Sequence, residues 1–291
     1  MDEHPSKTES IPSKYKNPTE ASRIYFLPNF FTAGNLFFGF LAIIRCIQAK
    51  YDPSPLISKE YYTHAVWFIL LACICDSLDG RMARIGRQES IFGKEFDSIA
   101  DVVSFGVAPA LMVFFLILAP TEGYPLIRQV GWFIGFIYLL CAGVRLARFN
   151  VLTSPLFPSN TRDEALKISD FIGLPVPAAA GFIASLALVL NRFDLQRFTI
   201  LLPALMLLIA WLMISNISYP SFKNINLQTQ TPFKAFVFIV IAGGLILLLR
   251  EISFAVLFLS YVFYGLLRDL SPRLRKKLKA FSFDKKNGEK L

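Results

Sequence analysis

The sequence predicts an all-α integral membrane protein with about eight transmembrane helices and both termini in the cytoplasm. Three observations lead to this prediction. First, 54% of the residues are apolar and only 18% are charged, whereas soluble domains are about 25% charged. Second, the charged residues are confined to short stretches between long apolar runs. Third, most Lys and Arg fall on one side when these runs are threaded alternately through a membrane, as the positive-inside rule requires.

Eight runs carry few or no charges. Each approaches the roughly 20 residues that a helix needs to cross the hydrocarbon layer, if flanking residues are included. The last two runs meet at Arg250 and Glu251, which predicts a tight hairpin at that charged pair; the alternative is one bent span with an interfacial extension. The predicted spans are 24–44, 61–75, 102–119, 129–144, 171–191, 198–219, 235–249 and 252–267.

The charge distribution places the loop after the second span in the cytoplasm. The net charge is +9, which this threading explains by helix orientation and by contact of the basic tail with anionic lipid. Nucleic-acid binding is not favoured, because no fold or aromatic pattern for it is present. The predicted domains are a polar N-terminal segment (1–23), a membrane core (24–223), a C-terminal helical hairpin (232–267) and a basic cytoplasmic tail (268–291).

Four aspartates gather at the cytoplasmic ends of the second and third spans. Asp76 and Asp79 are three residues apart and share one helix face. Asp97 and Asp101 are four residues apart and share another. The polar segment between the two pairs contains Gly86 and can turn the chain, so two antiparallel helices would present their carboxylates to each other. An acid within the membrane is energetically expensive and indicates a functional site.

This group of acids predicts a divalent-metal site. Four carboxylates cannot all be ionised close together without cations, and oxygen ligands select Mg²⁺, Mn²⁺ or Ca²⁺. Two ions bound in this way are a familiar means of clamping phosphoryl groups. Gly80, Ala83 and Gly93 leave room for a ligand beside the acids, and Arg84 offers a guanidinium fork to phosphate. The alternative is that the acids are interfacial and pair with arginines of the same loop.

The segment from Asp76 to Asp101 also resembles a known signature. It reads Asp-x-x-Asp-Gly-x-x-Ala-Arg, then eight residues, then Gly-x-x-x-Asp-x-x-x-Asp, and is similar to the CDP-alcohol phosphotransferases. With further motifs, the chain looks most like the CDP-diacylglycerol–serine O-phosphatidyltransferases from 26 to 223. These motifs lie at 27–35, 93–98, 102–106, 145–150, 173–175 and 219–223.

The resemblance implies a six-helix catalytic core, here followed by two further helices. It implies transfer of the phosphatidyl group from CDP-diacylglycerol to the hydroxyl of L-serine, with two Mg²⁺ or Mn²⁺ ions and release of CMP. Matched by position, the metal ligands are Asp76, Asp79, Asp97 and Asp101, and Asp101 is also the general base. The residues implied for the CDP-diacylglycerol site are Asn29, Thr32, Gly80, Ala83, Arg84 and Gly93.

Recognition of serine requires a basic group for its carboxylate. Arg145 and Arg148 lie three residues apart at the cytoplasmic end of the fourth span, and a guanidinium suits a carboxylate well. We expect one of them, with Asn150, to form part of the acceptor pocket. The alternative is that both arginines are positive-inside anchors.

The expected setting is the bacterial cytoplasmic membrane, with the active site facing the cytoplasm. Relatives of this kind are often homodimers, and Gly131 and Gly135 form a small-xxx-small pair suited to close helix packing.

Two other functions are open. One is the same chemistry with glycerol 3-phosphate, inositol or an inositol phosphate as acceptor. The other is divalent-cation transport, which would distribute acids through the membrane depth or in corresponding halves, whereas here they collect at one boundary.

Overall fold

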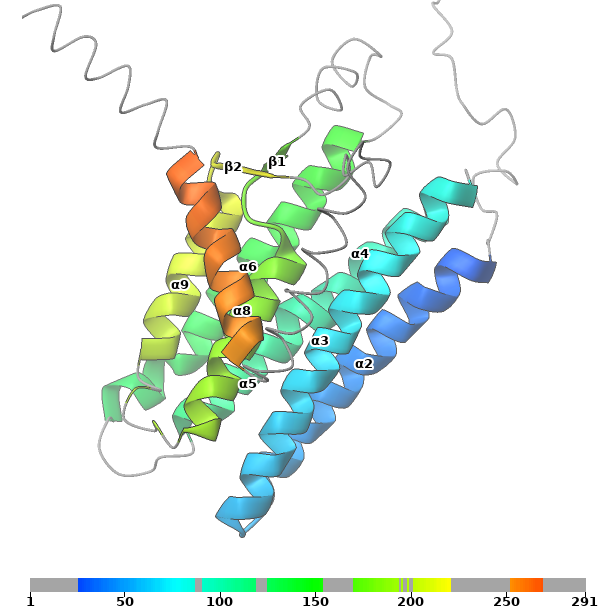
Figure 1. Ribbon diagram of the computed structural model, residues 1–291. Coiled ribbons are helices and arrows are strands. Elements are labelled where there is room, and N and C mark those ends of the chain that lie inside the picture. Colours follow the sequence, from blue (N-terminus) through cyan, green and yellow to red (C-terminus); the bar gives the residue numbers. More distant parts are fainter. Residues whose placement is uncertain are drawn as a thin grey trace, which may run out of the picture.

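A computed structural model describes residues 26–86, 91–118, 125–153, 170–193, 195, 198, 201–220 and 252–268. These residues form a bundle of long helices (Figure 1). The helices are α2 (Phe26–Tyr51), α3 (Pro55–Gly86), α4 (Ile91–Asp101), the π-helical η1 (Val102–Val107), α5 (Ala108–Leu118), α6 (Pro125–Thr153), α8 (Val176–Arg192), α9 (Leu201–Ile214) and the Ile252–Arg268 helix. Two short strands, β1 (Asp170–Ile172) and β2 (Ser218–Pro220), pair antiparallel.

The described helices have the lengths and surfaces of a membrane protein. Four spans are long and apolar enough to cross a bilayer: Asn29–Tyr51, Pro55–Met82, Phe92–Leu116 and Gly131–Leu152. Large apolar side chains remain exposed on the outer faces; Trp132 of α6 is 62% exposed and Trp211 of α9 is 60% exposed. Contiguous exposed apolar surface of this kind marks contact with a membrane or a partner. The chain is therefore a helical membrane protein, as predicted.

Seven of the eight predicted apolar runs overlap described helices. The helices of the fifth, sixth and eighth runs are shorter than the four long spans, and the sixth run, expected to end at 219, has its helix end at Ile214 because Ser218–Pro220 forms strand β2. The run 235–249 and the hairpin at Arg250 and Glu251 lie outside the described residues, as do the N-terminal segment and the basic tail. The total of eight spans and the cytoplasmic placement of the termini therefore stay predictions.

The start of the fifth predicted span differs from the structure. The run was expected to begin at 171, but α8 begins at Val176 because Asp170–Ile172 forms strand β1. Gly173 follows with φ of 80°, a left-handed conformation that glycine adopts without steric cost. Its N–H donates to the carbonyl of Ile217 at 2.9 Å. This turn joins the entry of α8 to the exit of α9, so the fold carries a small strand pair in addition to its helices.

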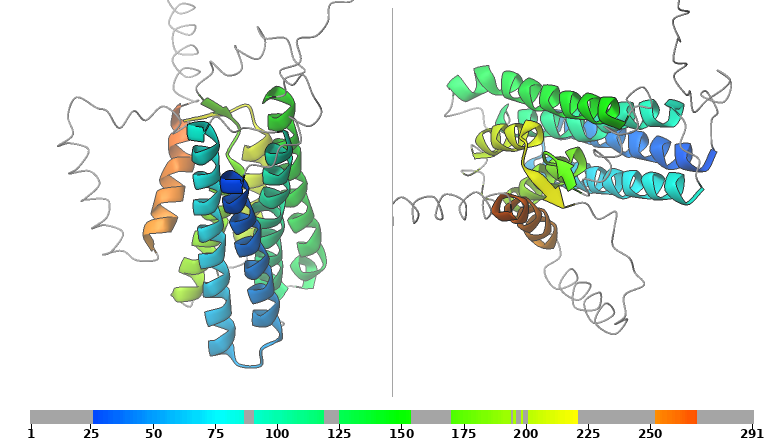
Figure 2. Two further views of the ribbon diagram at one scale, coloured as in Figure 1. Left: turned by 90° about the vertical axis from the view of Figure 1, so that its right-hand side faces the viewer. Right: turned by 90° about the horizontal axis from the view of Figure 1, so that it is seen from above.

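Helix α2 is fixed against both acidic helices. It packs along α3 and against α4 and η1, and α2 and α3 lie side by side at one edge of the bundle (Figure 2). A Cβ at Gly39 would overlap Ser104 of η1, so glycine allows this close approach. The Ser104 hydroxyl donates to the backbone carbonyl of Asn35 at 2.9 Å. The register between α2 and the helix carrying Asp97 and Asp101 is thereby set.

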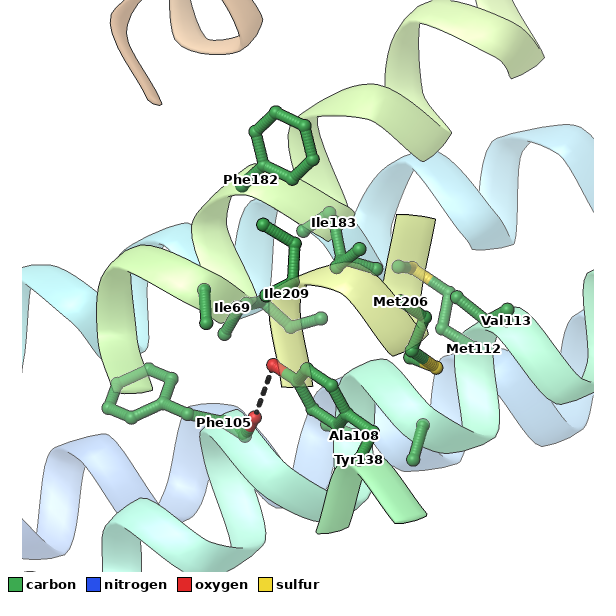
Figure 3. Close-up of a cluster of buried hydrophobic side chains, with 14 of the residues drawn as sticks. Ile69, Phe105, Ala108, Met112, Val113, Tyr138, Phe182, Ile183, Met206 and Ile209 are labelled. Atoms are coloured by element: carbon green, nitrogen blue, oxygen red, sulfur yellow. Dashed lines mark hydrogen bonds between the residues drawn. The ribbon is translucent and has the colours of Figure 1, made fainter. Parts of the chain in front are cut away.

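The π-helical segment η1 begins directly after Asp101 and is anchored from α6. Single π turns inside longer helices occur frequently at functional sites. Tyr138 is fully buried, and its hydroxyl donates to the carbonyl of Phe105 at 3.0 Å (Figure 3). Apolar side chains from α5, α8 and α9, including Met112 and Ile209, surround this bond. The end of the acidic helix is therefore held by the central core of the bundle.

The small-xxx-small pair of α6 packs within the chain. A Cβ at Gly135 would lie 3.6 Å from the carbonyl oxygen of Ala110, and one at Gly131 would lie 3.9 Å from the Phe114 ring, both on α5. These two glycines therefore serve the contact between α6 and α5.

Candidate active site

The structure brings the predicted acids together. Carboxylate oxygens of Asp76, Asp97 and Asp101 all lie within 4.8 Å of one another, and the carboxyl groups of Asp79 and Asp97 are within hydrogen-bonding range. Asp79 and Asp101 are each only 5% exposed. Helices α3 and α4 therefore place the two aspartate pairs close together, which is the arrangement that their spacing predicted.

The cluster has the chemistry of a site for hard divalent cations. Its donors are carboxylate oxygens, which suit Mg²⁺, Mn²⁺ and Ca²⁺. Oδ1 of Asp97 is buried and has no hydrogen-bond partner within the described ranges; such a buried polar atom is costly unless a ligand satisfies it. Arg145 of α6 interacts electrostatically with Asp76 and Asp101. Among the side chains that the structure describes, this single guanidinium does not balance four carboxylates, so the site favours added positive charge.

One face of α2 completes the acidic site. Thr32 donates its hydroxyl to Oδ2 of Asp79 at 2.9 Å, and Asn35 donates Nδ2 to Oδ1 of Asp101 at 3.0 Å. Asn29 lies one turn before Thr32 on the same face, and its Nδ2 is buried without a hydrogen-bond partner among the residues described. This amide is placed to donate to a ligand.

The two candidate arginines point to different partners. Arg145 lies within electrostatic range of Asp76 and Asp101, and of Tyr261 on the Ile252–Arg268 helix. Arg148 donates to Oδ1 of Asn216, beyond the end of α9, at 3.2 Å. Asn150 donates to the Ser98 hydroxyl at 2.9 Å and so ties the end of α6 to α4. Of the three residues predicted for serine, the structure brings Arg145 to the acids and gives the other two roles in joining helices.

Comparison with known proteins agrees with this geometry. Residues 25–215 match the family described as CDP-alcohol phosphatidyltransferase. The chain belongs to this family. The prediction made from the Asp76–Asp101 signature is thereby confirmed.

Several relatives of this phosphatidyltransferase share a name. A CDP-diacylglycerol–serine O-phosphatidyltransferase of Helicobacter pylori is 33% identical over 247 residues, covering 84% of this chain and 91% of that protein. The protein of the same name from Methanocaldococcus jannaschii is 32% identical over 201 residues, covering 69% and 81% of the two chains. The one from Saccharomyces cerevisiae is 35% identical over 161 residues, covering 55% and 53%.

The residues expected at the nucleotide site of the phosphatidyltransferase lie on both acidic helices and on α2. Gly80, Ala83 and Arg84 follow Asp79 on α3, and Gly93 precedes Asp97 on α4. The side chains of Ala83 and Arg84 are outside the described residues. A Cβ at Gly80 would meet no atom within 4 Å among those described, so the space at Gly80 is free of described atoms.

Gly80→Ala tests whether a substrate occupies that space. Alanine should leave the helix as stable or up to about 1 kcal/mol more stable, because it favours helix over glycine, but it should raise the KM for the CDP-linked donor. Thermal unfolding in detergent and donor-dependent rates measure the two effects. Gly39→Ala is the contrasting variant and should lower the unfolding temperature, since its Cβ overlaps Ser104. Unchanged donor kinetics in Gly80→Ala would argue against a donor beside Gly80.

Asn216 and Tyr261 are contacts of the site that sequence reasoning missed, whereas Asn35 and Ser98 lie in the motifs 27–35 and 93–98 but were given no role at the site. Asn35 had a usable signal, because it lies three residues after Thr32 and therefore on the same face of α2. Asn216 and Tyr261 lie in segments whose contacts depend on packing between distant parts of the chain, and their local patterns carry no sign of a site.

Proposed function

We propose that the protein transfers the phosphatidyl group of CDP-diacylglycerol to the hydroxyl of L-serine, giving phosphatidylserine and CMP. The observation that carries this proposal is the cluster of Asp76, Asp97 and the buried Asp101, with Arg145 within electrostatic range of it. The acids suit metal-assisted phosphoryl transfer, and the guanidinium suits an acceptor that carries a carboxylate. The names of the relatives support serine as that acceptor.

The four aspartates, Asp76, Asp79, Asp97 and Asp101, would hold two Mg²⁺ or Mn²⁺ ions. Divalent ions, when bound, supply positive charge that neutralises the diphosphate of the donor. Asp101 takes the proton of the serine hydroxyl as general base. The serine oxygen then forms a bond to the phosphatidyl phosphorus, and the bond between that phosphorus and the bridging oxygen breaks, so that CMP leaves with this oxygen.

The remaining site residues divide between donor and acceptor. Asn29, Thr32, Gly80, Ala83, Arg84 and Gly93 line the CDP-diacylglycerol site in this proposal, and the open space at Gly80 and the buried amide of Asn29 support it. Arg145 binds the serine carboxylate. Arg148 and Asn150 act on the acceptor pocket by holding the end of α6 to its neighbours.

We further propose that the enzyme lies in the bacterial cytoplasmic membrane as a homodimer with its site facing the cytoplasm. The distribution of Lys and Arg between the predicted loops supports this orientation. The basic residues of 268–291 would contact anionic lipid.

The test is release of CMP from CDP-diacylglycerol by the purified protein in detergent. L-serine should stimulate release more than glycerol 3-phosphate, inositol or inositol phosphate does. Chelation of divalent ions should abolish release, and added Mn²⁺ should restore it. Faster release with another acceptor would reassign the acceptor, and full activity in chelator would exclude a metal requirement.

A further inference from the structure

The side chain of Asn35 is held beside Asp101 by its amide nitrogen, and its amide oxygen is left over for another hydrogen bond. Asn35 is fully buried. An ionised carboxylate accepts hydrogen bonds and cannot donate them, so the amide NH₂ faces Asp101 and the amide carbonyl faces away from it. Oδ1 of Asn35 has no hydrogen-bond partner in the part of the chain that the structure describes.

The backbone around Asn35 fixes the direction of this carbonyl. Ser104 donates to the backbone oxygen of Asn35, and Gly39, one turn further along α2, packs directly on Ser104. With its main chain and its Nδ2 both held, the side chain has little freedom to turn. A buried carbonyl that is left unpaired is costly, so its place next to the reacting groups indicates a donor on the substrate.

Two further groups of different chemistry lie near the carboxylate of Asp101. Asp101 is the acceptor of a hydroxyl proton, Asn35 on α2 offers a carbonyl oxygen, and Arg145 on α6 offers a guanidinium near Asp101. An amino acid with a hydroxyl side chain carries one complementary group for each: a hydroxyl, an ammonium and a carboxylate. Inositol and glycerol 3-phosphate carry no ammonium, so only the amino-acid acceptor can offer the carbonyl of Asn35 a charged N–H donor.

We propose that Asn35 both orients Asp101 through Nδ2 and accepts a hydrogen bond from the ammonium of the amino-acid acceptor through Oδ1. This inference rests on the proposed function, since it assumes that serine is the acceptor. It makes Asn35 a specificity-determining residue for the ammonium and a positioning residue for the base.

The decisive experiment compares two ligands that differ only in the ammonium. L-serine and 3-hydroxypropionate are titrated calorimetrically into detergent-purified protein loaded with Mn²⁺ and CMP, where the absence of a lipid donor prevents turnover. The unaltered protein should bind serine about tenfold or more tightly than 3-hydroxypropionate, because a hydrogen bond to a charged group is lost with the ammonium. In Asn35→Leu the affinity for serine should fall to that for 3-hydroxypropionate, and the latter should change little.

The positioning role has a separate measurement. At saturating serine, kcat for CMP release by Asn35→Leu should fall by about tenfold to a hundredfold, because the base loses its orienting donor. The rise in unfolding temperature produced by Mn²⁺ should persist, since the aspartates remain. Asn35→Ala, which adds no bulk to the site, should give the same pattern if the leucine variant folds poorly.

Asn191→Leu is the matched control. Asn191 of α8 also ties two helices, donating to the backbone oxygen of Lys59 and the hydroxyl of Thr63. Thr63 is about 20 Å along α3 from Asp76, so this variant should keep the serine preference and kcat.

The outcomes separate the two proposals. If the unaltered protein binds and uses serine but Asn35→Leu keeps the full preference over 3-hydroxypropionate, the ammonium contact is overturned and the proposed function stands. If Asn35→Leu no longer showed the rise in unfolding temperature with Mn²⁺ but still preferred serine over 3-hydroxypropionate, Oδ1 of Asn35 would belong to the metal site instead. An unchanged kcat would overturn the positioning role. If the unaltered protein neither binds nor uses serine, both the inference and the proposed acceptor fail.

Discussion

Asp101→Asn should fold and insert normally but lose phosphatidyl transfer by about 10²–10⁴-fold, the usual contribution of a positioned general base. Asparagine has nearly the shape of aspartate, and its Oδ1 can still accept from Nδ2 of Asn35, so the packing of α2 on α4 is kept. What is lost is the negative charge and the ability to take the acceptor proton. CMP release in detergent measures the loss, and thermal unfolding verifies the fold.

Asp97→Asn separates the role of base from that of ligand. The carboxylate of Asp97 is in the same cluster as that of Asp101 but takes no part in the proposed proton transfer. The activity lost in Asp97→Asn should therefore be partly restored at raised Mn²⁺ concentration. Asp101→Asn should show no such recovery. If added Mn²⁺ restored the activity of Asp101→Asn, Asp101 would be a metal ligand and not the base. If Asp101→Asn were fully active without added Mn²⁺, Asp101 would be neither.

Arg145→Lys should raise the KM for serine by about tenfold to a hundredfold, the effect of losing a hydrogen bond to a charged group, with a smaller change in kcat. Lysine keeps the positive charge but not the planar fork that grips a carboxylate through two parallel bonds. The effect should fall mainly on the acceptor, because Arg145 of α6 binds the serine carboxylate in this proposal, whereas the proposed donor residues lie on α2, α3 and α4. Initial rates over a range of serine concentrations give both constants.

Arg148→Lys makes the same change one turn along α6. Arg148 contacts Asn216, so its replacement should affect serine KM much less than that of Arg145. An equal effect of the two variants would indicate a general loss of charge at the end of α6. An unchanged KM in Arg145→Lys would remove this residue from the acceptor pocket.

The sequence by itself determined the membrane character, the family and the four aspartates. A long apolar run can be recognised as a helix from the local sequence alone, and described helices overlap seven of the predicted runs. The acids could be paired in advance because spacings of three and four residues fix which side chains share a helix face, and a short polar segment between them forces the two faces together. All of this information is local in the chain.

Only the tertiary structure decided what surrounds the acids. Spacing placed Arg145 and Arg148 on one face but could not show that one interacts with the acids and the other binds Asn216. The strand pair before α8 could not be predicted either, because it joins Asp170–Ile172 to Ser218–Pro220, which are far apart in the sequence. The role of Asn35 depends on the close approach of Gly39 to Ser104, which brings α2 against Asp101. Such contacts arise from how helices pack, and helix packing depends on shape complementarity between segments that are distant in the sequence.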